Sequence, residues 1–210
     1  MPGLIQKSGY IKPGGGGAGH YAKYIATRDG VEMVTEDVQT GDRYMKYIAE
    51  RPRSHGLFSA EPMTDLEKTM AAVSAHPAPV WTFIYSLKRE DAARLGYDSA
   101  ERWRRLLTAH QVELAEAMKI PPKDLRWCAA FHDEKHHPHV HMMVWSADPK
   151  QGYLTGKGIE KMRSKLTNEI FRDDLLHLYQ QKDLSYKEVT QAAQDAMREL
   201  VQEMESSLCA

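Results

Sequence analysis

The chain has 210 residues, of which 42% are hydrophobic and 27% charged, and its formal net charge is −1. These values fit one globular domain with an appendage and argue against a strongly basic nucleic-acid binder. No apolar run approaches the roughly 20 residues of a membrane span, and the N-terminus lacks the apolar core of a signal peptide, so we expect a cytoplasmic protein.

The charge is distributed unevenly along the chain. Residues 183–205 carry six acidic and two basic side chains, a net charge of −4, which leaves +3 for the remainder. We therefore expect a mildly basic domain over residues 1–183 and an acidic helical tail over residues 184–210. Cys128 and Cys209 form neither a disulfide framework nor a CxxC zinc motif.

The N-terminal half predicts two strands and two helices. LIQKSGYI at 4–11 is typical of a short strand, and PGGGGAG at 13–19 predicts a flexible loop where backbone can approach a ligand. Helices are predicted over 18–28 and 43–51. VWTFIYSL at 80–87 predicts a central strand that is buried on both faces.

The C-terminal half predicts a hairpin between helices. A helix over 99–119 should be capped at Asp98, and a strand hairpin should follow over 125–146. Two further amphipathic helices are predicted over 156–180 and 186–207. Together these elements predict an α+β fold with a mainly antiparallel central sheet, flanking helices and a site on the open face of the sheet.

The stretch FHDEKHHPHVHMMVWS, residues 131–146, holds five of the ten histidines. With the period of a strand, His139 and His141 point to one face. Across a short polar loop, an antiparallel partner strand ending at His132 would place that ring opposite His139. Cross-strand Cβ atoms lie about 4.5–5.5 Å apart, so three imidazoles could converge on one ion.

This spacing predicts a three-histidine metal site. Imidazole suits zinc, manganese, iron, nickel or copper, and three protein ligands leave positions open for substrate. His136 and His137 have no partner at strand spacing, so we interpret them as surface residues of the loop.

A three-histidine metal site beside a helix that bears tyrosines suggests attack of a phenolic oxygen on a phosphodiester. A bound ion would neutralise charge on the phosphate and orient it for in-line displacement. Tyrosine has an ordinary pKa near 10, so it is a weak nucleophile until its proton is removed.

Several segments resemble one family of DNA-processing enzymes. FHDEKHHPHVHMMV resembles the third motif of conjugative relaxases in the HUH endonuclease superfamily, and GHYAKYIATRDGVE resembles the tyrosine-bearing first motif of their MobP class. Three further segments are similar to a subgroup of that class carried on mobilisable and integrative elements. They are SHGLFS at 54–59, SLKREDAARLGYDSAERWR at 86–104 and GYLTGKGIEKMRS at 152–164.

The resemblance implies a metal bound by His132, His139 and His141, and a nucleophile at Tyr24. It also implies a relaxase fold that binds single-stranded DNA at an origin of transfer, cuts one strand and stays joined to its 5′ end. The ion would be one divalent metal, Mg²⁺ or Mn²⁺, with Zn²⁺ or Ni²⁺ as alternatives. Further partners would be accessory relaxosome proteins and a coupling protein.

The residues themselves leave the nucleophile open. His20 and Tyr24 share one helix face, but Tyr21 lies three residues before Tyr24 and partly shares its side. Tyr10, Tyr44 and Tyr47 are further candidates, and Tyr47 lies in a near-repeat, KYIAER, of the KYIATR around Tyr24.

The carboxylate that would orient the metal-bound histidines is also unassigned. Many relaxases have Asp two places after the first histidine, where this chain has Glu134. The strand 80–87 contains no carboxylate, so Glu134 and Glu90 are the candidates.

Basic side chains near the site would contact the DNA, with stacking by Tyr21 or Trp103. The candidate basic residues are Lys23, Arg28, Arg51, Arg53, Lys88, Arg89, Lys157 and Lys161.

Four other functions would use similar residues. A rolling-circle replication initiator or a single-strand transposase of the same superfamily would use the same metal and tyrosine. A cupin-like oxygenase would need a further histidine on a downstream strand, yet His177 falls in a predicted helix. A relaxase remnant that only binds DNA would form no covalent product.

Overall fold

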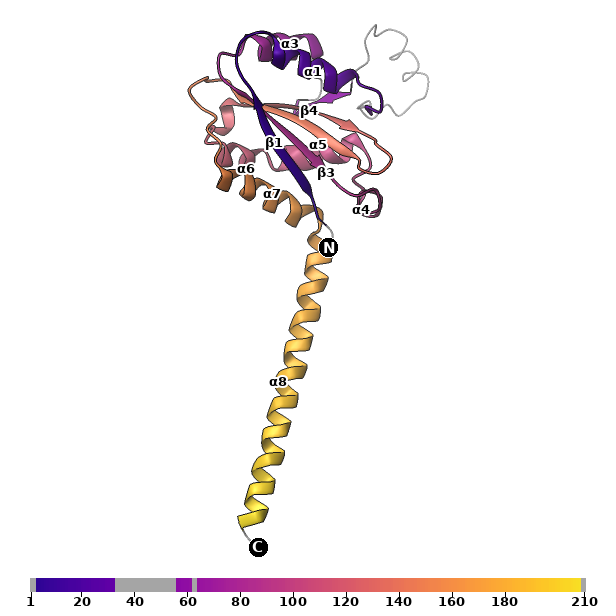
Figure 1. The fold of residues 1–210 in the computed structure, drawn as a ribbon, viewed down its shortest axis with the longest axis vertical. Helices are drawn as coiled ribbons and strands as arrows, with labels where there is room; N and C mark the ends of the chain where they lie inside the picture. The colour runs from indigo at the N-terminus through magenta and orange to yellow at the C-terminus, as the bar shows by residue number, and fades with distance from the viewer. Residues whose placement is uncertain (1–2, 33–55, 62–63, 209–210) are drawn as a thin grey trace. The chain divides into compact units, whose positions relative to one another are not determined.

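The computed structural model describes residues 3–32, 56–61 and 64–208. In this part of the chain, a five-stranded sheet has the order β1-β3-β5-β4-β2, and every pair in it is antiparallel (Figure 1). The α+β class predicted from the sequence is confirmed. The strands are β1 (Ile5–Ile11), β2 (Leu57–Phe58), β3 (Val80–Ser86), β4 (Leu125–His132) and β5 (His139–Ser146).

Helices cover both faces of the sheet (Figure 1). The helices α1 (Gly17–Thr27) and α3 (Leu66–Ala75) pack on the histidine-bearing face, where Ala22 and Ile25 of α1 join a buried cluster with Cys128. The opposite face is covered by α5 (Ala100–Ala109), α6 (Gln111–Ala117) and α7 (Gly156–Ile170). The remaining elements are α4 (Arg89–Leu95), the short 3₁₀ turn η1 (Pro122–Asp124) and α8 (Arg172–Leu208).

The glycine loop between β1 and α1 turns the chain onto the histidine-bearing face. Gly14, Gly15 and Gly16 have φ of 91°, 72° and 70°, a left-handed conformation that disfavours other residues. Because α1 starts from this turn, it runs back across the face and brings its tyrosines toward the hairpin.

The strands of the sheet depart from prediction in two respects. β2 pairs with β4 through Leu57 and Phe58, and the sequence analysis did not predict this strand. β3 is an interior strand, but Thr82 and Ile84 are only partly buried, so the prediction of burial on both faces was wrong. The helices α3 and α4 were also not predicted.

The predicted helix over 99–119 is two helices. Its N-cap is Ser99, whose hydroxyl accepts a hydrogen bond from the backbone N–H of Arg102, and not Asp98 as predicted. The helix breaks at His110, where α5 ends and α6 begins. The His110 ring is bonded at Nδ1 to the Leu106 carbonyl oxygen, so it occupies the junction between the helices.

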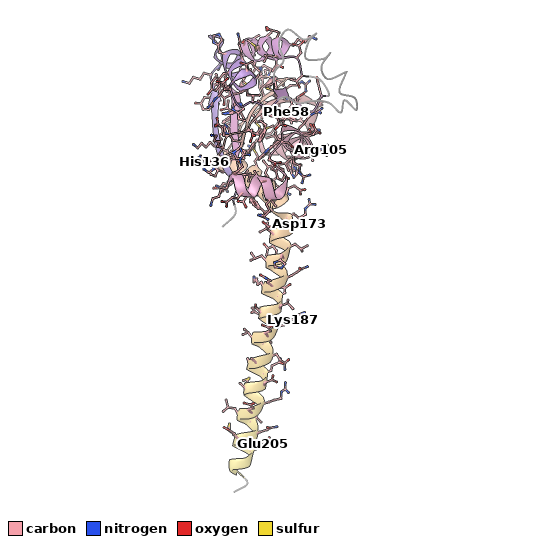
Figure 2. All side chains as sticks on the ribbon, turned by 90° about the vertical axis from the view of Figure 1, so that its right-hand side faces the viewer. Phe58, Arg105, His136, Asp173, Lys187 and Glu205 are labelled. Carbon is pink, nitrogen blue, oxygen red and sulfur yellow. The ribbon has the colours of Figure 1, made fainter. Side chains whose placement is uncertain are left out.

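The C-terminal helices are divided differently from the prediction. α7 ends at Ile170, and α8 then continues without a break from Arg172 to Leu208, across the predicted gap at 180–186. The chain separates into two compact units, residues 1–167 and 168–210. Figure 2 shows side chains projecting from α8 along its length, including Lys187 and Glu205. Within the described residues, no helix combines the length and apolar character that a membrane crossing requires.

The predicted helix over 43–51 lies outside the described residues.

Candidate metal centre

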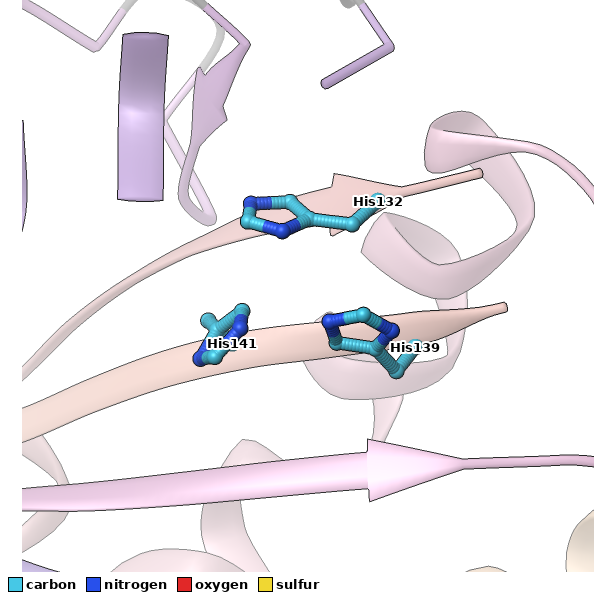
Figure 3. A group of neighbouring side chains, drawn as sticks. All are labelled: His132, His139 and His141. Carbon is cyan, nitrogen blue, oxygen red and sulfur yellow. The ribbon is translucent and has the colours of Figure 1, made fainter. Parts of the chain in front are cut away.

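The hairpin of β4 and β5 brings three histidine rings together. His132 is paired directly with His139, and Ala130 is paired with His141, so all three side chains leave the sheet on one face. Their ring centroids are 4.6–5.1 Å apart, and one nitrogen of each ring lies within 4.8 Å of the others (Figure 3). The predicted cross-strand pairing and the convergence of the three rings are confirmed.

The outer nitrogen of each ring has a hydrogen-bond partner. His132 Nε2 donates to the backbone oxygen of Ile25 at 2.9 Å, and His139 Nδ1 donates to the backbone oxygen of His137 at 2.9 Å. His141 Nδ1 shares a hydrogen bond of 2.9 Å with the hydroxyl of Tyr21. A carbonyl acceptor fixes the proton on the outer nitrogen, so the inner nitrogen keeps its lone pair.

In the part of the chain that the structure describes, two inner nitrogens are buried without a hydrogen-bond partner. They are His132 Nδ1 and His141 Nε2, on residues whose exposures are only 0% and 6%. A buried polar atom without a hydrogen bond costs free energy, so such atoms call for an explanation. A divalent cation would supply it, because both nitrogens then become ligands. The residues present therefore fit a metal ion.

Burial also keeps these two rings neutral. Desolvation is the main reason that the pKa of His141 falls to about 3, and the neighbouring His132 and His139 lower it further. Desolvation likewise lowers the pKa of His132. Because a metal ligand must be deprotonated, these lowered pKa values favour metal binding at neutral pH.

Arg89 braces the loop that joins the two strands. Its guanidinium pairs with Asp133 at 2.6 Å and donates to the backbone oxygens of Glu134 and Lys135, and its backbone N–H donates to the His136 oxygen at 3.1 Å. Four consecutive loop residues are therefore tied to the start of α4. This bracing holds the adjacent His137 carbonyl, which orients His139.

The two tyrosines of α1 occupy different environments. Tyr21 is partly buried against His141, and its pKa rises to about 12, chiefly through desolvation and then through the nearby Tyr24. Tyr24 is 49% exposed, with its ring 6.3 Å from that of Tyr21 and the guanidinium of Arg28 at 5.6 Å. Tyr21 is thus engaged with a histidine, whereas Tyr24 is open to solvent.

Neither predicted carboxylate contacts a ring nitrogen of the cluster. Glu134 instead pairs with Arg28 at 3.4 Å, and Glu90 lies in the first turn of α4. Backbone oxygens and Tyr21 fill the positions in which a carboxylate was expected, so the expectation of an orienting carboxylate is not met in the described residues.

The predicted DNA contacts are scattered. Lys23 and Arg28 lie at or next to α1, and Lys88 and Arg89 lie at the start of α4, on the side of the site. Lys157 and Lys161 lie on α7, which packs on the face opposite the histidines, and Lys161 pairs with Glu116.

Other candidates are excluded or lie outside the description. Trp103 cannot stack on DNA, because it is fully buried and its indole N–H donates to the Tyr97 oxygen. The candidates at positions outside the described residues are Tyr44, Tyr47, Arg51 and Arg53.

Sequence reasoning missed Ile25 and His137 as orienting residues. Both act through backbone oxygens, so their side chains carry no signal for this role.

Comparison with known proteins gives one match. A family model described as MobL relaxases matches residues 52–210, which include the whole histidine hairpin. The comparisons with curated proteins and with solved structures returned no match. Because the family model covers more than half of the chain, the protein belongs to the MobL relaxase family.

Proposed function

We propose that this protein nicks one strand of DNA at an origin of transfer and becomes joined to the 5′ end through a phosphotyrosine. Membership of a relaxase family implies a DNA endonuclease that acts in mobilisation. The finer proposal places the chain in the MobP class of the HUH superfamily, with residues 1–183 as the catalytic domain in the cytoplasm and 184–210 as a tail. The observation that carries the proposal is the histidine cluster with two partnerless inner nitrogens.

His132, His139 and His141 would hold one divalent ion through their inner nitrogens. Mg²⁺ or Mn²⁺ is our first choice, with Zn²⁺ or Ni²⁺ as alternatives that suit imidazole well. When bound, the ion would act as a Lewis acid toward the oxygens of the scissile phosphate. The protein's part is to fix the three rings, through Ile25, His137 and Tyr21.

Tyr24 is the proposed nucleophile, and Tyr21 is the residue that positions His141. A phosphodiester can approach the exposed Tyr24, whereas the Tyr21 hydroxyl is occupied by a histidine. In the reaction, a bond forms between the Tyr24 oxygen and phosphorus, and the bond to the 3′ oxygen breaks. The phenolic proton is transferred to the departing 3′ oxygen, which leaves as a hydroxyl group. The family match begins at residue 52, so the choice between these tyrosines depends on their geometry.

Single-stranded DNA is the proposed substrate, with relaxosome proteins and a coupling protein as further partners. Lys23 and Arg28, at or next to α1, and Lys88, at the start of α4, are the candidates for phosphate contacts. Arg89 already braces the loop, so we assign it a structural role there.

A denaturing-gel assay for covalent adducts tests this function. The protein would be incubated, with Mn²⁺ or with chelator, with single-stranded oligonucleotides tiled across the DNA that flanks its gene. We expect one tile to give a metal-dependent protein–DNA band that Tyr24→Phe abolishes.

Two further tyrosine variants control the assay. Tyr21→Phe should still form the band at saturating metal, because its hydroxyl is not the attacking group. Tyr153→Phe changes a tyrosine that is 68% exposed in a loop beyond β5 and should behave as wild type. If folded, metal-loaded protein gives no band with any tile, the protein is a DNA-binding remnant or not a nuclease, and the proposal fails.

A further inference from the structure

The sheet face beside the histidines includes a strip that none of the described residues covers with a helix. Strand register places Lys7 opposite Ile84, and Ile84 opposite His141, so these three residues form one row across β1, β3 and β5. In the adjacent row, Ile5 lies opposite Ser86, which lies opposite His139. Directly paired residues point to the same face, so Ile5, Lys7 and Ile84 share the face of the metal centre.

This strip is accessible in the described structure. α1 packs chiefly on α3 and β4. On β1, Ile11 packs against the buried cluster that includes Ala18 and Ala22, and Ile11 is at the other end of the strand from Ile5. Ile5 is 48% exposed, Lys7 is exposed and Ile84 is partly buried. An aliphatic surface with one cation, next to a metal centre, suits a nucleobase and a phosphate better than it suits a protein core.

Within the described residues, Lys7 has no competing ion-pair partner. Across the ranges that the structure describes, no carboxylate forms an ion pair with its ammonium group. The backbones of Lys7 and His141 are two strand spacings apart, a distance of about 10 Å. A lysine side chain spans much of this gap, so its ammonium group can reach a phosphate one nucleotide away from a phosphate held at the histidines.

The geometry of in-line displacement indicates which part of the DNA would lie on the strip of Ile5, Lys7 and Ile84. The attacking oxygen and the leaving oxygen lie on opposite sides of phosphorus. Tyr24 attacks from α1, on the β4 side of the cluster, so the departing 3′ oxygen points toward β3 and β1. We propose that Lys7, with Ile5 and Ile84, binds the DNA segment that ends in the released 3′ hydroxyl. This inference rests on the proposed function.

Salt-dependent binding of the single-stranded probe (dT)20 tests the Lys7 contact without requiring a nick. Loss of one phosphate contact should reduce the slope of log affinity against log salt by about 0.7, or about fivefold in affinity at 0.1 M salt. We expect this change in Lys7→Gln, recovery in Lys7→Arg, and none in the matched control Lys150→Gln, in an exposed loop beyond β5. An unchanged slope in Lys7→Gln would overturn the proposal.

A second experiment tests which DNA segment Lys7 binds. It uses the two halves of the oligonucleotide that reacts with wild-type protein. Lys7→Gln should weaken binding of the half that ends in the 3′ hydroxyl severalfold and leave the other half unaffected. Equal weakening of both halves would contradict the assignment. If wild-type protein forms no adduct, the proposed function fails, and the (dT)20 measurement still decides whether Lys7 binds a phosphate.

Discussion

The two faces of the central sheet differ in the side chains that the hairpin of β4 and β5 places on them. On the face covered by α5, α6 and α7, Phe83, Tyr85, Phe131 and Met142 are buried against other apolar groups. On the other face, β4 and β5 carry histidines with buried nitrogens that have no hydrogen-bond partner among the described residues. The same hairpin therefore supplies stability through one set of alternating residues and chemistry through the other. Variants of adjacent positions on one strand should separate the two properties.

Removing a histidine from the cluster should have the largest effect on catalysis. We expect His139→Ala to lower cleavage by at least about 10³-fold, because a bound metal supplies several kcal/mol of transition-state stabilisation. Much of the DNA affinity should remain, because contacts between basic side chains and the DNA backbone should supply most of the binding. Cleavage rates and oligonucleotide binding would be measured together, with His136→Ala from the loop that precedes β5 as the control. If folded His139→Ala lost binding and cleavage equally, the histidines would contribute to DNA binding as much as to cleavage, which contradicts this prediction.

Cys128 lies on the histidine-bearing face, in the buried cluster formed with α1, and we expect its thiol to be unreactive in the folded protein. Burial raises the pKa of Cys128 to about 12, so at pH 8 to 9 its thiolate should be about 10³-fold scarcer than that of a free cysteine. Thiol labelling in a Cys209→Ser background would measure the rate. This group's contribution to stability is present below pH 9 and is lost as the pH rises toward 12. Rapid labelling of the native protein at pH 8 would show that this end of the face is open.

Substitutions on the opposite face of the sheet should lower the free energy of unfolding. Phe131→Ala removes a fully buried ring one residue away from His132, and we expect the free energy of unfolding to fall by about 3–5 kcal/mol. Urea unfolding would measure this loss. At low temperature, the folded fraction should still bind Mn²⁺ with nearly wild-type affinity, because the histidines lie on the other side of the strand. A large loss of metal affinity in the folded variant would mean that the two faces are coupled.

Tyr21→Phe should have a smaller effect, confined to the metal centre. Loss of a group that orients a metal-bound histidine typically reduces metal affinity by about 10–100-fold. Calorimetric titration with Mn²⁺ would measure the change, with Tyr153→Phe as the control. Wild-type affinity in Tyr21→Phe would show that the hydroxyl does not position His141.

Local sequence pattern was sufficient to predict the hairpin but not its surroundings. Alternation and a six-residue loop predicted the pairing of His132 with His139, and the register confirms it. The break at His110 and the continuous α8 were missed, because helical periodicity continues through a short kink and polar residues do not by themselves end a helix. β2 has two residues, too few to show a period.

The orienting groups of the site could not be predicted for a different reason. The sequence suggested a carboxylate, Glu134 or Glu90, because carboxylates are recognisable as residue types. The oxygens of Ile25 and His137 perform this role through the backbone, which every residue has. Tyr21 was identified as a candidate, but for attack or stacking. Its contact with His141 joins residues 120 positions apart, and only the tertiary fold reveals it.

The most direct test of the central claim is to identify the tyrosine that carries the DNA. Wild-type adduct would be trimmed with nuclease, digested with trypsin and analysed by mass spectrometry. Tyr24 lies on peptide 24–28, whereas Tyr10 and Tyr21 lie on peptide 8–23, and Tyr47 lies on peptide 47–53. We predict a nucleotide attached to peptide 24–28, formed only when divalent metal is present. A nucleotide on any other peptide, or an adduct that forms equally in chelator, would contradict a metal-dependent attack by Tyr24.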